Sequence, residues 1–189
     1  MRSHMPLERV VADLVVRAEH RFFGKYRGTV VDNEDPARLG RLRLTVPSVL
    51  GRDVVTGWAF PCAPFGGAAG QGMLFVPEPK AHVWVEFEEG DPEFPIWVGA
   101  FWTSSDAGAE TPGDPQDRPT RKIIRTLKGH TIELEDADGE ERVTIGDAAG
   151  NMIEMTGSAM RIIARQPLTF DAAGQPIKIV CSSLDIERG

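Results

Sequence analysis

The stretches of this sequence that could bind a phosphate or a metal ion are a glycine-rich run and an acidic run. The glycine-rich run, residues 66–72, lacks a following Lys-Ser/Thr pair and the strand–turn–helix setting of a phosphate-binding loop. The acidic run, residues 135–141, places Glu141 where an EF-hand loop that begins at Asp136 requires glycine. We therefore interpret the first run as a flexible loop and the second as a solvated turn.

The cysteines and histidines are too scattered to form a metal site or a catalytic centre. Cys62 and Cys181 stand far apart, and none of the four histidines has metal-ligand spacing to another candidate ligand. The sequence also contains no GxSxG, HExxH or Walker motif. We expect two reduced, packed thiols, no catalytic residue, no metal, no cofactor, and a protein that is not an enzyme.

Composition narrows the fold class and the kind of partner. The chain has 189 residues, of which 41% are hydrophobic and 26% are charged, as in typical globular proteins. Its 20 glycines and 14 prolines predict many turns and so favour an all-β fold. The net charge of −7 repels nucleic-acid phosphates. No apolar run reaches the roughly 20 residues of a membrane-spanning helix, and the N-terminus is not a signal peptide, so we expect synthesis in the cytoplasm.

Residues 1–21 are predicted to form a short amphipathic helix at the N-terminus. Their apolar side chains recur at the three- and four-residue spacing of one helix face. The members of this N-terminal stripe are Leu7, Val10, Val11, Leu14 and Val15. Such a helix either covers an edge of its own domain or docks on a partner.

Residues 22–103 read as consecutive short strands separated by turns. The candidate strands are residues 25–32, 41–47, 54–62, 72–76, 82–88 and 95–102. Two of these strands alternate cleanly and have one apolar face each, namely Leu42, Leu44 and Val46, and Val83, Val85 and Phe87. Trp84 points to the opposite face, so that side is expected to be covered too. Five or six short strands in this length predict a small closed barrel or a sandwich.

Residues 104–120 are rich in proline and polar residues and are predicted to be an extended linker. After the linker, residues 121–189 carry a weak repeat of strand, Asp-x-x-Gly turn and strand, with turns at Asp136, Asp147 and Asp171. The strand-like runs are residues 131–135, 141–145, 143–146, 152–156, 168–170 and 176–180. A ladder of such strands has an apolar face that it cannot cover alone. This segment must therefore assemble with a copy of itself or with a partner, as in stacked β-helices and β-prisms.

Two stretches of the barrel segment carry a more specific pattern. One is Phe-Phe-Gly-Lys-Tyr-Arg-Gly-Thr-Val-Val-Asp-Asn-x-Asp-Pro at residues 22–36, and the other is Gly-Asp-Pro-Glu-Phe-Pro-Ile-Trp-Val-Gly at residues 90–99. Shorter motifs lie between them at residues 40–47, 57–62 and 77–78. Together they resemble the OB-fold domain of phage baseplate assembly protein V and of VgrG-like spike proteins, most closely the short spikes of extracellular contractile injection systems. Residues 129–136 and 147–151 are similar to the start of the β-helical needle that follows this domain in VgrG-like proteins.

The resemblance implies an all-β fold with an OB-fold barrel at residues 22–103, followed by a strand–turn repeat that winds into an intertwined, trimeric, triple-stranded β-helix. The expected trimer core consists of Ile132, Leu134, Val143, Ile145, Ile153, Met155, Ile162, Leu168, Phe170, Ile177 and Ile179. A one-residue slip in register would exchange the two faces of each strand, so the inward face is open at this point. The His-x-His device of some phage spike tips is absent, so the resemblance implies no metal.

The resemblance also implies a function and partners. The protein would be a homotrimeric, structural spike in the baseplate of a contractile injection system or phage tail-like particle, and would contact the target membrane only during puncture on sheath contraction. We expect the baseplate hub to be a separate protein, contacted by the N-terminal stripe. Leu184 and Ile186 are the candidate docking residues for a PAAR-type tip protein.

Two alternatives from other classes were weighed against the spike. OB folds also bind single-stranded nucleic acid through aromatic side chains and basic grooves. The barrel segment has more acidic than basic residues, and its four tryptophans are more typical of a core. A cell-wall-degrading enzyme would need a catalytic domain, for which no motif is found. Whether the particle is a phage, a bacteriocin or an extracellular injection system stays open.

Overall fold

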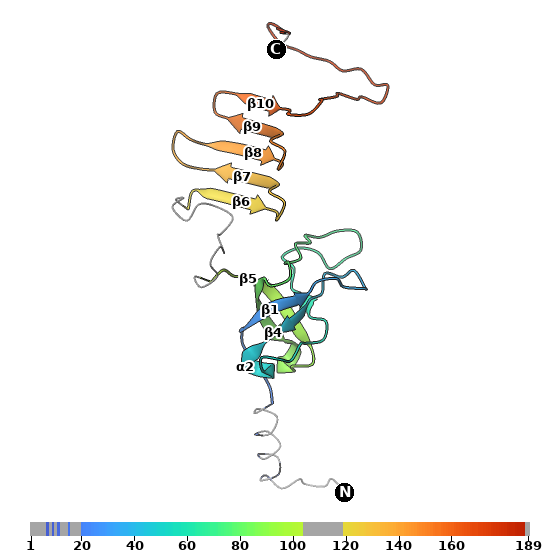
Figure 1. The fold of residues 1–189 in the computed structure, drawn as a ribbon, viewed down its shortest axis with the longest axis vertical. Coiled ribbons are helices and arrows are strands. Elements are labelled where there is room, and N and C mark those ends of the chain that lie inside the picture. The colour runs from blue at the N-terminus through green and yellow to red at the C-terminus, as the bar shows by residue number, and fades with distance from the viewer. Residues whose placement is uncertain are drawn as a thin grey trace. The chain divides into compact units, whose positions relative to one another are not determined.

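The structure is a computed structural model that describes Leu7, Arg9, Val11, Val15, residues 20–103 and residues 119–187. The chain divides into two compact units, Met1–Ala109 and Glu110–Gly189. Each unit contains one five-stranded sheet, and helix is almost absent from the described residues (Figure 1). The predicted N-terminal helix and the predicted linker fall largely outside the described residues.

The first unit contains one curled sheet. Its strands are β1 (Tyr26–Asp32), β2 (Arg43–Thr45), β3 (Phe60–Pro61), β4 (His82–Phe87) and β5 (Pro95–Ala100). They lie in the order β2-β1-β4-β5-β3, with every pair antiparallel except β3 and β5. Register shifts interrupt the β1–β2 and β4–β5 pairings, and such irregularities increase the local bend of a sheet.

Two isolated bridges bring the ends of this sheet together. Leu42, just before β2, pairs with Ala59, just before β3, and the two residues exchange backbone hydrogen bonds of 3.0 and 2.7 Å. Thr45 and Val55 form a second antiparallel bridge, beside which the Thr56 amide donates a 2.8 Å hydrogen bond to the Leu44 carbonyl. Because β2 and β3 are the two outer strands, these bridges join the opposite edges of the sheet. The result is an OB-like barrel, as the sequence predicts.

The core of the first unit confirms the predicted alternation. Its fully buried side chains include the predicted faces Leu42, Leu44 and Val46 of one segment and Val83 and Val85 of β4. Phe87 and Trp97 are buried beside them, and the indole nitrogen of Trp97 donates a 3.1 Å hydrogen bond to the carbonyl of Gly40. Trp84 is half-buried on the other face, beneath Phe101, as predicted.

Two sequence predictions are wrong here, namely a strand at residues 72–76 and the packing of both thiols, of which Cys62 lies in this unit. Residues 72–76 form no strand, because glycines with positive φ, among them Gly70 and Gly72, turn the backbone out of the extended conformation before it can pair. Residues 47–50 form the short helix α2 (Pro47–Leu50), and η1 (Glu88–Gly90) follows β4. Cys62 and Cys181 are free but exposed, so the expected packing of both thiols is wrong.

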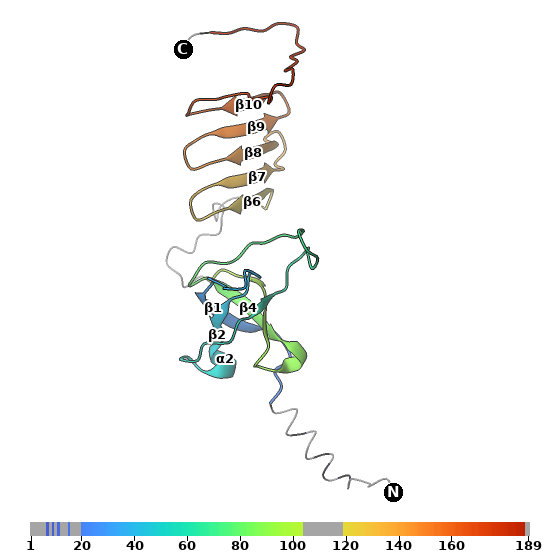
Figure 2. The same ribbon diagram turned by 90° about the vertical axis from the view of Figure 1, so that its right-hand side faces the viewer.

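The second unit is an antiparallel meander in which every strand pairs with the next (Figures 1 and 2). Its strands are β6 (Arg121–Arg125), β7 (Thr131–Glu135), β8 (Arg142–Gly146), β9 (Met152–Thr156) and β10 (Met160–Ile163). The predicted runs at residues 131–135 and 152–156 are confirmed to the residue. β6 and β10 were not predicted as strands.

The chain beyond β10 differs from the prediction. Residues 168–170 and 176–180 are expected to be strands, but the described residues 164–187 contain none. These runs alternate apolar and polar side chains as strands do, yet a strand needs a neighbour to pair with, and among the described residues no segment pairs with them as a strand. The turn between them is nevertheless formed, because the Gln175 amide donates a 2.9 Å hydrogen bond to the Ala172 carbonyl.

Candidate functional site

The second sheet has a row of isoleucines that crosses all five strands. Its members, each the cross-strand partner of the next, are Ile124, Ile132, Ile145, Ile153 and Ile162. Directly opposed residues of an antiparallel pair project from the same face, so these five side chains lie side by side on one surface. The turns between the strands set this register.

A second row lies two residues along each strand and therefore on the same face. It consists of Lys122, Leu134, Val143, Met155 and Met160. We call the two rows together the apolar face. Lys122, at one end, is its only charged side chain.

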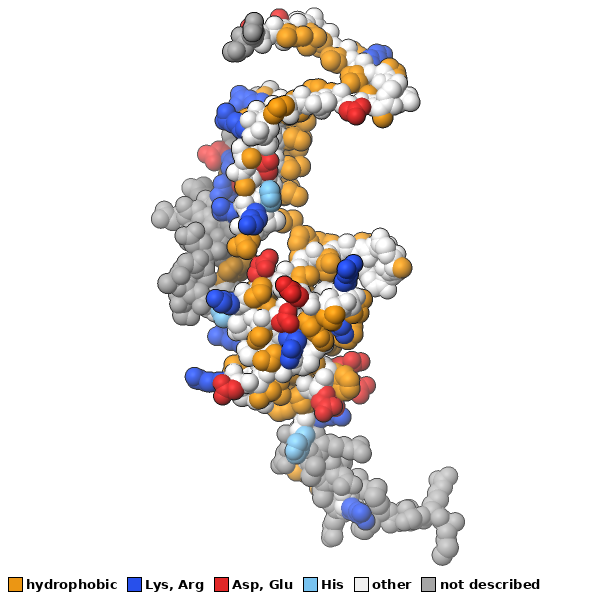
Figure 3. Space-filling view, turned by 45° about the vertical axis from the view of Figure 1, so that its right-hand side comes forward, with side chains coloured by type: hydrophobic (Ala, Val, Ile, Leu, Met, Phe, Trp, Pro, Cys, Tyr) orange, Lys and Arg blue, Asp and Glu red, His pale blue; other side chains and the backbone are white. Residues whose placement is uncertain are grey.

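The apolar face is open to solvent within a single chain. Ile132 and Ile145 are 42% and 45% exposed, and Ile162 is 52% exposed. Figure 3 shows a column of hydrophobic side chains along the unit that carries β6–β10. Covering a half-exposed aliphatic side chain stabilises a protein by about 1 kcal/mol. Because nine apolar side chains share the face, covering it with a complementary surface would stabilise the resulting assembly substantially.

The opposite face of the same sheet is mostly polar, although Ile123, Met152 and Ile163 also lie on it, and several of its charges pair with one another. Arg121 Nε lies 3.1 Å and Arg142 Nη2 lies 2.9 Å from the same carboxylate oxygen of Glu133. On the neighbouring row, the pKa of Glu135 is lowered, mainly by a hydrogen bond from the Thr120 hydroxyl and then by the Ala137 amide. This face therefore suits contact with water, and the apolar face is the one that requires a cover.

The structure brings together most of the predicted core residues. Seven of them lie on the apolar face: Ile132, Leu134, Val143, Ile145, Ile153, Met155 and Ile162. The remaining four lie beyond β10 and are exposed: Leu168, Phe170, Ile177 and Ile179. Ile124 and Met160 belong to the face but were missed. Their alternation with polar neighbours was a usable signal, although each strand is short and Ile124 follows the linker directly.

The other predicted contact residues are exposed where they are described. Leu7, Val11 and Val15 of the N-terminal stripe have exposed side chains, and Val10 and Leu14 lie outside the described residues. Leu184 and Ile186 are 63% and 87% exposed. Nothing in the described part of the chain covers them.

An ion pair between Asp35 and Arg41 in the first unit, which we call the Asp35–Arg41 clasp, was not predicted. The carboxylate of Asp35 accepts hydrogen bonds from the backbone amides of Ala37 and Leu39 and from the guanidinium of Arg41, with Arg41 Nη2 2.6 Å from Asp35 Oδ1. These contacts, above all the Arg41 guanidinium, hold the pKa of Asp35 well below its usual range. The Arg41 guanidinium also lies 5.6 Å from the ring centre of Trp58 and 5.5 Å from that of Phe60. The clasp therefore ties the β1–β2 loop to the chain that enters β3.

These features of the barrel coincide with a known domain. Residues 26–102 match the family model of the type VI secretion system/phage-baseplate injector OB domain. The matched segment contains the whole curled sheet, the Asp35–Arg41 clasp and Trp97. The injector OB domain is a structural component of baseplates, so the match indicates a structural role in an assembled phage or secretion-system particle. The expected resemblance to a baseplate OB-fold domain is thereby confirmed for the barrel, and the narrower resemblance to VgrG-like spikes stays a prediction. No curated protein matches the chain.

The outer face of the barrel carries a group of aromatic side chains. The Trp84 and Phe101 rings lie 4.6 Å apart, and the Arg27 guanidinium lies 5.8 and 5.5 Å from their centres. His82 stacks on Phe101 at 5.5 Å. Because these groups cover one another, they offer little free ring surface on which a nucleotide base could stack.

Neither a metal site nor a membrane-spanning helix is found in the described part of the chain. No group of three or more His, Cys, Asp or Glu side chains there is arranged to hold an ion. No helix among the described residues is long and apolar enough to cross a bilayer.

Proposed function

We propose that this chain is a structural, non-enzymatic spike subunit of a contractile injection system or phage tail-like particle. Three copies would form the spike, which links a baseplate hub to a tip protein and pierces the target envelope on sheath contraction. The match of the barrel to the injector OB domain carries the proposal for the particle. The apolar face of the second unit supports the trimeric needle.

The two faces of the second sheet fit the walls of a triangular prism. Three sheets, each with its apolar face turned inward, would close on one another and bury all three isoleucine rows. The charged face, with Glu133 bonded to Arg121 and Arg142, would then line the outside in contact with water. Threefold closure leaves no open interface and therefore sets the number of copies.

This architecture suits transmission of force. In an antiparallel meander the backbone amides and carbonyls of inner strands are paired on both sides. Within the described sheet only β6 and β10 are edge strands, so the parts most open to invasion or fraying are confined to its two ends.

The two ends of the chain are proposed as the partner contacts. The N-terminal stripe, with Leu7, Val11 and Val15 exposed, would pack against the hub protein. Leu184 and Ile186, both exposed, would receive a PAAR-type tip protein. Pull-down of a purified tip protein by the full chain, and its loss in Ile186→Asp, would test the second contact.

The trimer is tested by the absolute mass in solution, measured by light scattering on a sizing column. We expect three times the chain mass of 20.7 kDa. Ile145→Lys places a charge in the middle of the apolar face, and we expect it to abolish the trimer. Thr144→Lys is the matched control, because the same charge then lies on the opposite face between Glu133 and Glu154. A monomeric wild-type chain, or an intact trimer of Ile145→Lys, would contradict the proposal.

A further inference from the structure

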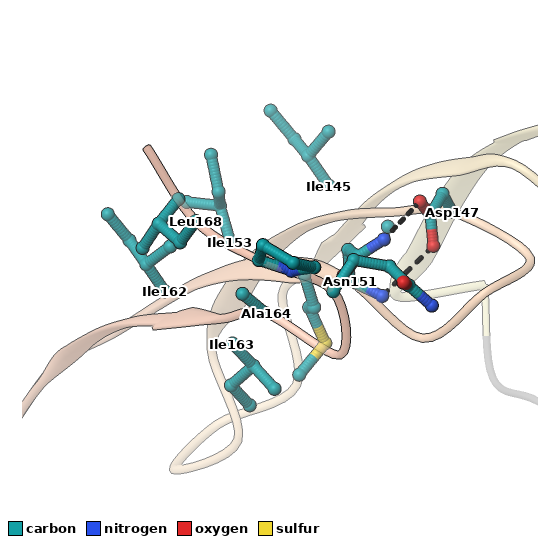
Figure 4. A pocket seen from close by; sticks show the side chains of 12 residues that line it. Ile145, Asp147, Asn151, Ile153, Ile162, Ile163, Ala164 and Leu168 are labelled. Carbon is teal, nitrogen blue, oxygen red and sulfur yellow. Dashed lines mark hydrogen bonds between the residues drawn. The ribbon is translucent and has the colours of Figure 1, made fainter. Parts of the chain in front are cut away.

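The barrel has a hollow of its own, apart from the apolar face. It has a volume of about 400 Å³ and is bordered by β3, the start of β5 and the turn that leads into β5. Its walls include three aromatic side chains, Trp58, Phe60 and Phe94, and two carboxylates, Glu88 and Glu93. We call it the acidic hollow. The hollow beside β9 in Figure 4 is instead lined by isoleucines of the apolar face, so it belongs to the surface described above.

The aromatic wall of the acidic hollow is fixed by the sheet and already attracts one guanidinium. β3 runs parallel to β5, with Phe60 opposite Ile96. The Arg41 guanidinium lies over the rings of Trp58 and Phe60, yet Arg41 is not among the residues that line the hollow. Aromatic rings attract cations through their electron-rich faces. Because both rings also border the hollow, they can contact a second cation there.

The acidic wall is formed by the turn before β5, whose backbone is held by its own hydrogen bonds. The Glu88 amide donates to the Phe94 carbonyl at 2.9 Å, and the Phe94 amide donates to the Asp91 carbonyl at 3.0 Å. The Asp91 carboxylate accepts a 3.1 Å hydrogen bond from the Glu93 amide. These bonds fix the backbone that carries Glu88, Glu93 and Phe94 at the border of the hollow.

The two carboxylates of the hollow have no cation beside them in the described part of the chain. Their neighbour Asp91 is paired, since its carboxylate lies 3.1 Å from Arg21. By contrast, no ion pair or side-chain hydrogen bond among the described residues involves the carboxylate of Glu88 or Glu93. The residues that line the hollow include no Lys, Arg or His. The charge of the hollow therefore attracts a cation and repels an anion.

We infer that the acidic hollow binds an arginine side chain presented by a partner protein. A guanidinium is flat, so it can stack on an aromatic ring while its N–H groups donate to carboxylates. Arg41 makes both kinds of contact in this same barrel, because it lies over two aromatic rings and pairs with Asp35. The inference requires neither the trimer nor the needle of the proposed function, because every residue of the hollow belongs to one barrel.

The first experiment compares two peptides on the full chain. Acetylated Gly-Arg-Gly amide carries the guanidinium, and the same peptide with citrulline keeps the shape of the side chain without its charge. Binding is followed by NMR through the indole N–H of Trp58, and Trp84 and Trp102, which do not line the hollow, are the internal references. We expect the arginine peptide to bind about tenfold more tightly than the citrulline peptide. Equal affinities, or shifts confined to the reference indoles, would overturn the inference.

The second experiment neutralises the two carboxylates. In Glu88→Gln/Glu93→Gln the side chains keep their shape, and we expect the preference for the arginine peptide to fall to about threefold or less. Glu89→Gln is the matched control, because Glu89 lies in the same turn but does not line the hollow. An unchanged preference in the double variant, or an equal loss in Glu89→Gln, would overturn the role of Glu88 and Glu93.

The aromatic wall is tested with the same peptides. Phe94→Leu keeps an apolar side chain but removes the ring, and we expect the arginine peptide to bind about threefold more weakly. Phe75→Leu is the control, because Phe75 is as exposed as Phe94 but does not line the hollow. Equal binding by Phe94→Leu and the wild type would overturn the aromatic contact. The spike itself is tested separately, by the mass in solution.

Discussion

Arg41 and Asp35 form an ion pair in the barrel, with Arg41 Nη2 2.6 Å from Asp35 Oδ1. The pair joins the motif at residues 22–36 to the motif at residues 40–47 across the β1–β2 loop. The Asp35 side chain is 3% exposed. Because the guanidinium also stacks over Trp58 and Phe60, the ion pair couples the loop to the closure of the sheet.

We expect Asp35→Asn to lower the melting temperature of the protein by several degrees, because the substitution removes the charge that Arg41 and the loop amides bind. Asp32→Asn is the matched control. Asp32 accepts one hydrogen bond, from the Glu34 amide, and its replacement should change the melting temperature little. Thermal unfolding followed by circular dichroism measures both. Equal melting temperatures for Asp35→Asn and the wild type would show that the clasp does not stabilise the barrel.

The clasp also predicts a dependence of stability on pH. The folded-state pKa of Asp35 is lowered below its ordinary value of 3.8, mainly by Arg41. A carboxyl of this kind stabilises the folded state fully above its unfolded-state pKa, and the contribution is lost as the pH falls through the folded-state pKa. We expect stability of the barrel to be steady from neutral pH to about pH 5 and to decline below about pH 4. Denaturant titrations at several pH values should show a shallower acid decline for Asp35→Asn.

Gly28 is expected to be intolerant of a side chain, although its backbone is not in the left-handed region. A Cβ at this position in β1 would lie 2.7 Å from Cγ2 of the buried Val85 and 3.3 Å from the Thr45 carbonyl. We expect Gly28→Ala to lower the free energy of unfolding by about 1–3 kcal/mol, as overpacking of a core does. Gly57→Ala, with no atom within 4 Å of the new Cβ, is the control and should be neutral. Chemical denaturation distinguishes the two variants.

For the charged face of the second sheet we expect the opposite result from that of Ile145→Lys, because a substitution there should lower stability without dissociating the proposed trimer. Glu133→Ala breaks the bonds to Arg121 and Arg142, and we expect it to lower the free energy of unfolding by about 1 kcal/mol while the mass of the proposed trimer stays unchanged. Light scattering and thermal unfolding of the same sample measure both quantities. Dissociation of the Glu133→Ala trimer would mean that the charged face, and not the apolar face, lies at the interface.

The fold was predictable where a local pattern determines the structure. Alternation identified the buried faces of Leu42, Leu44 and Val46, because a strand exposes alternate residues to opposite sides whatever its neighbours are. The prediction of a strand at residues 72–76 was wrong because pairing there is not decided by a local pattern. This run is as apolar as a strand, but whether it pairs depends on the path of the glycine-rich loop before it, which periodicity does not encode.

The candidate site was predictable strand by strand, but not as a surface. Alternation placed Ile145 and Ile153 on one side of their own strands. Their alignment into one row depends on the register, and the lengths of the intervening turns decide the register. Arg41 and Asp35 show the same limit, because the meeting of two charges across a loop follows from the path of that loop. The hydrogen bond from the Arg165 amide to the Asn151 side chain is a third case, since it joins residues 14 positions apart.

The isoleucine row has a consequence for how such a sheet changes size. Each additional hairpin contributes two more strands at a spacing of roughly 4.8 Å, so duplication of one hairpin would lengthen the sheet by about 10 Å. The width of the sheet would stay the same, because five-residue strands set it. The apolar rows would also stay on the same face. Relatives could therefore evolve longer or shorter sheets of this kind in fixed increments by gaining or losing single hairpins, without changing the two rows of the apolar face.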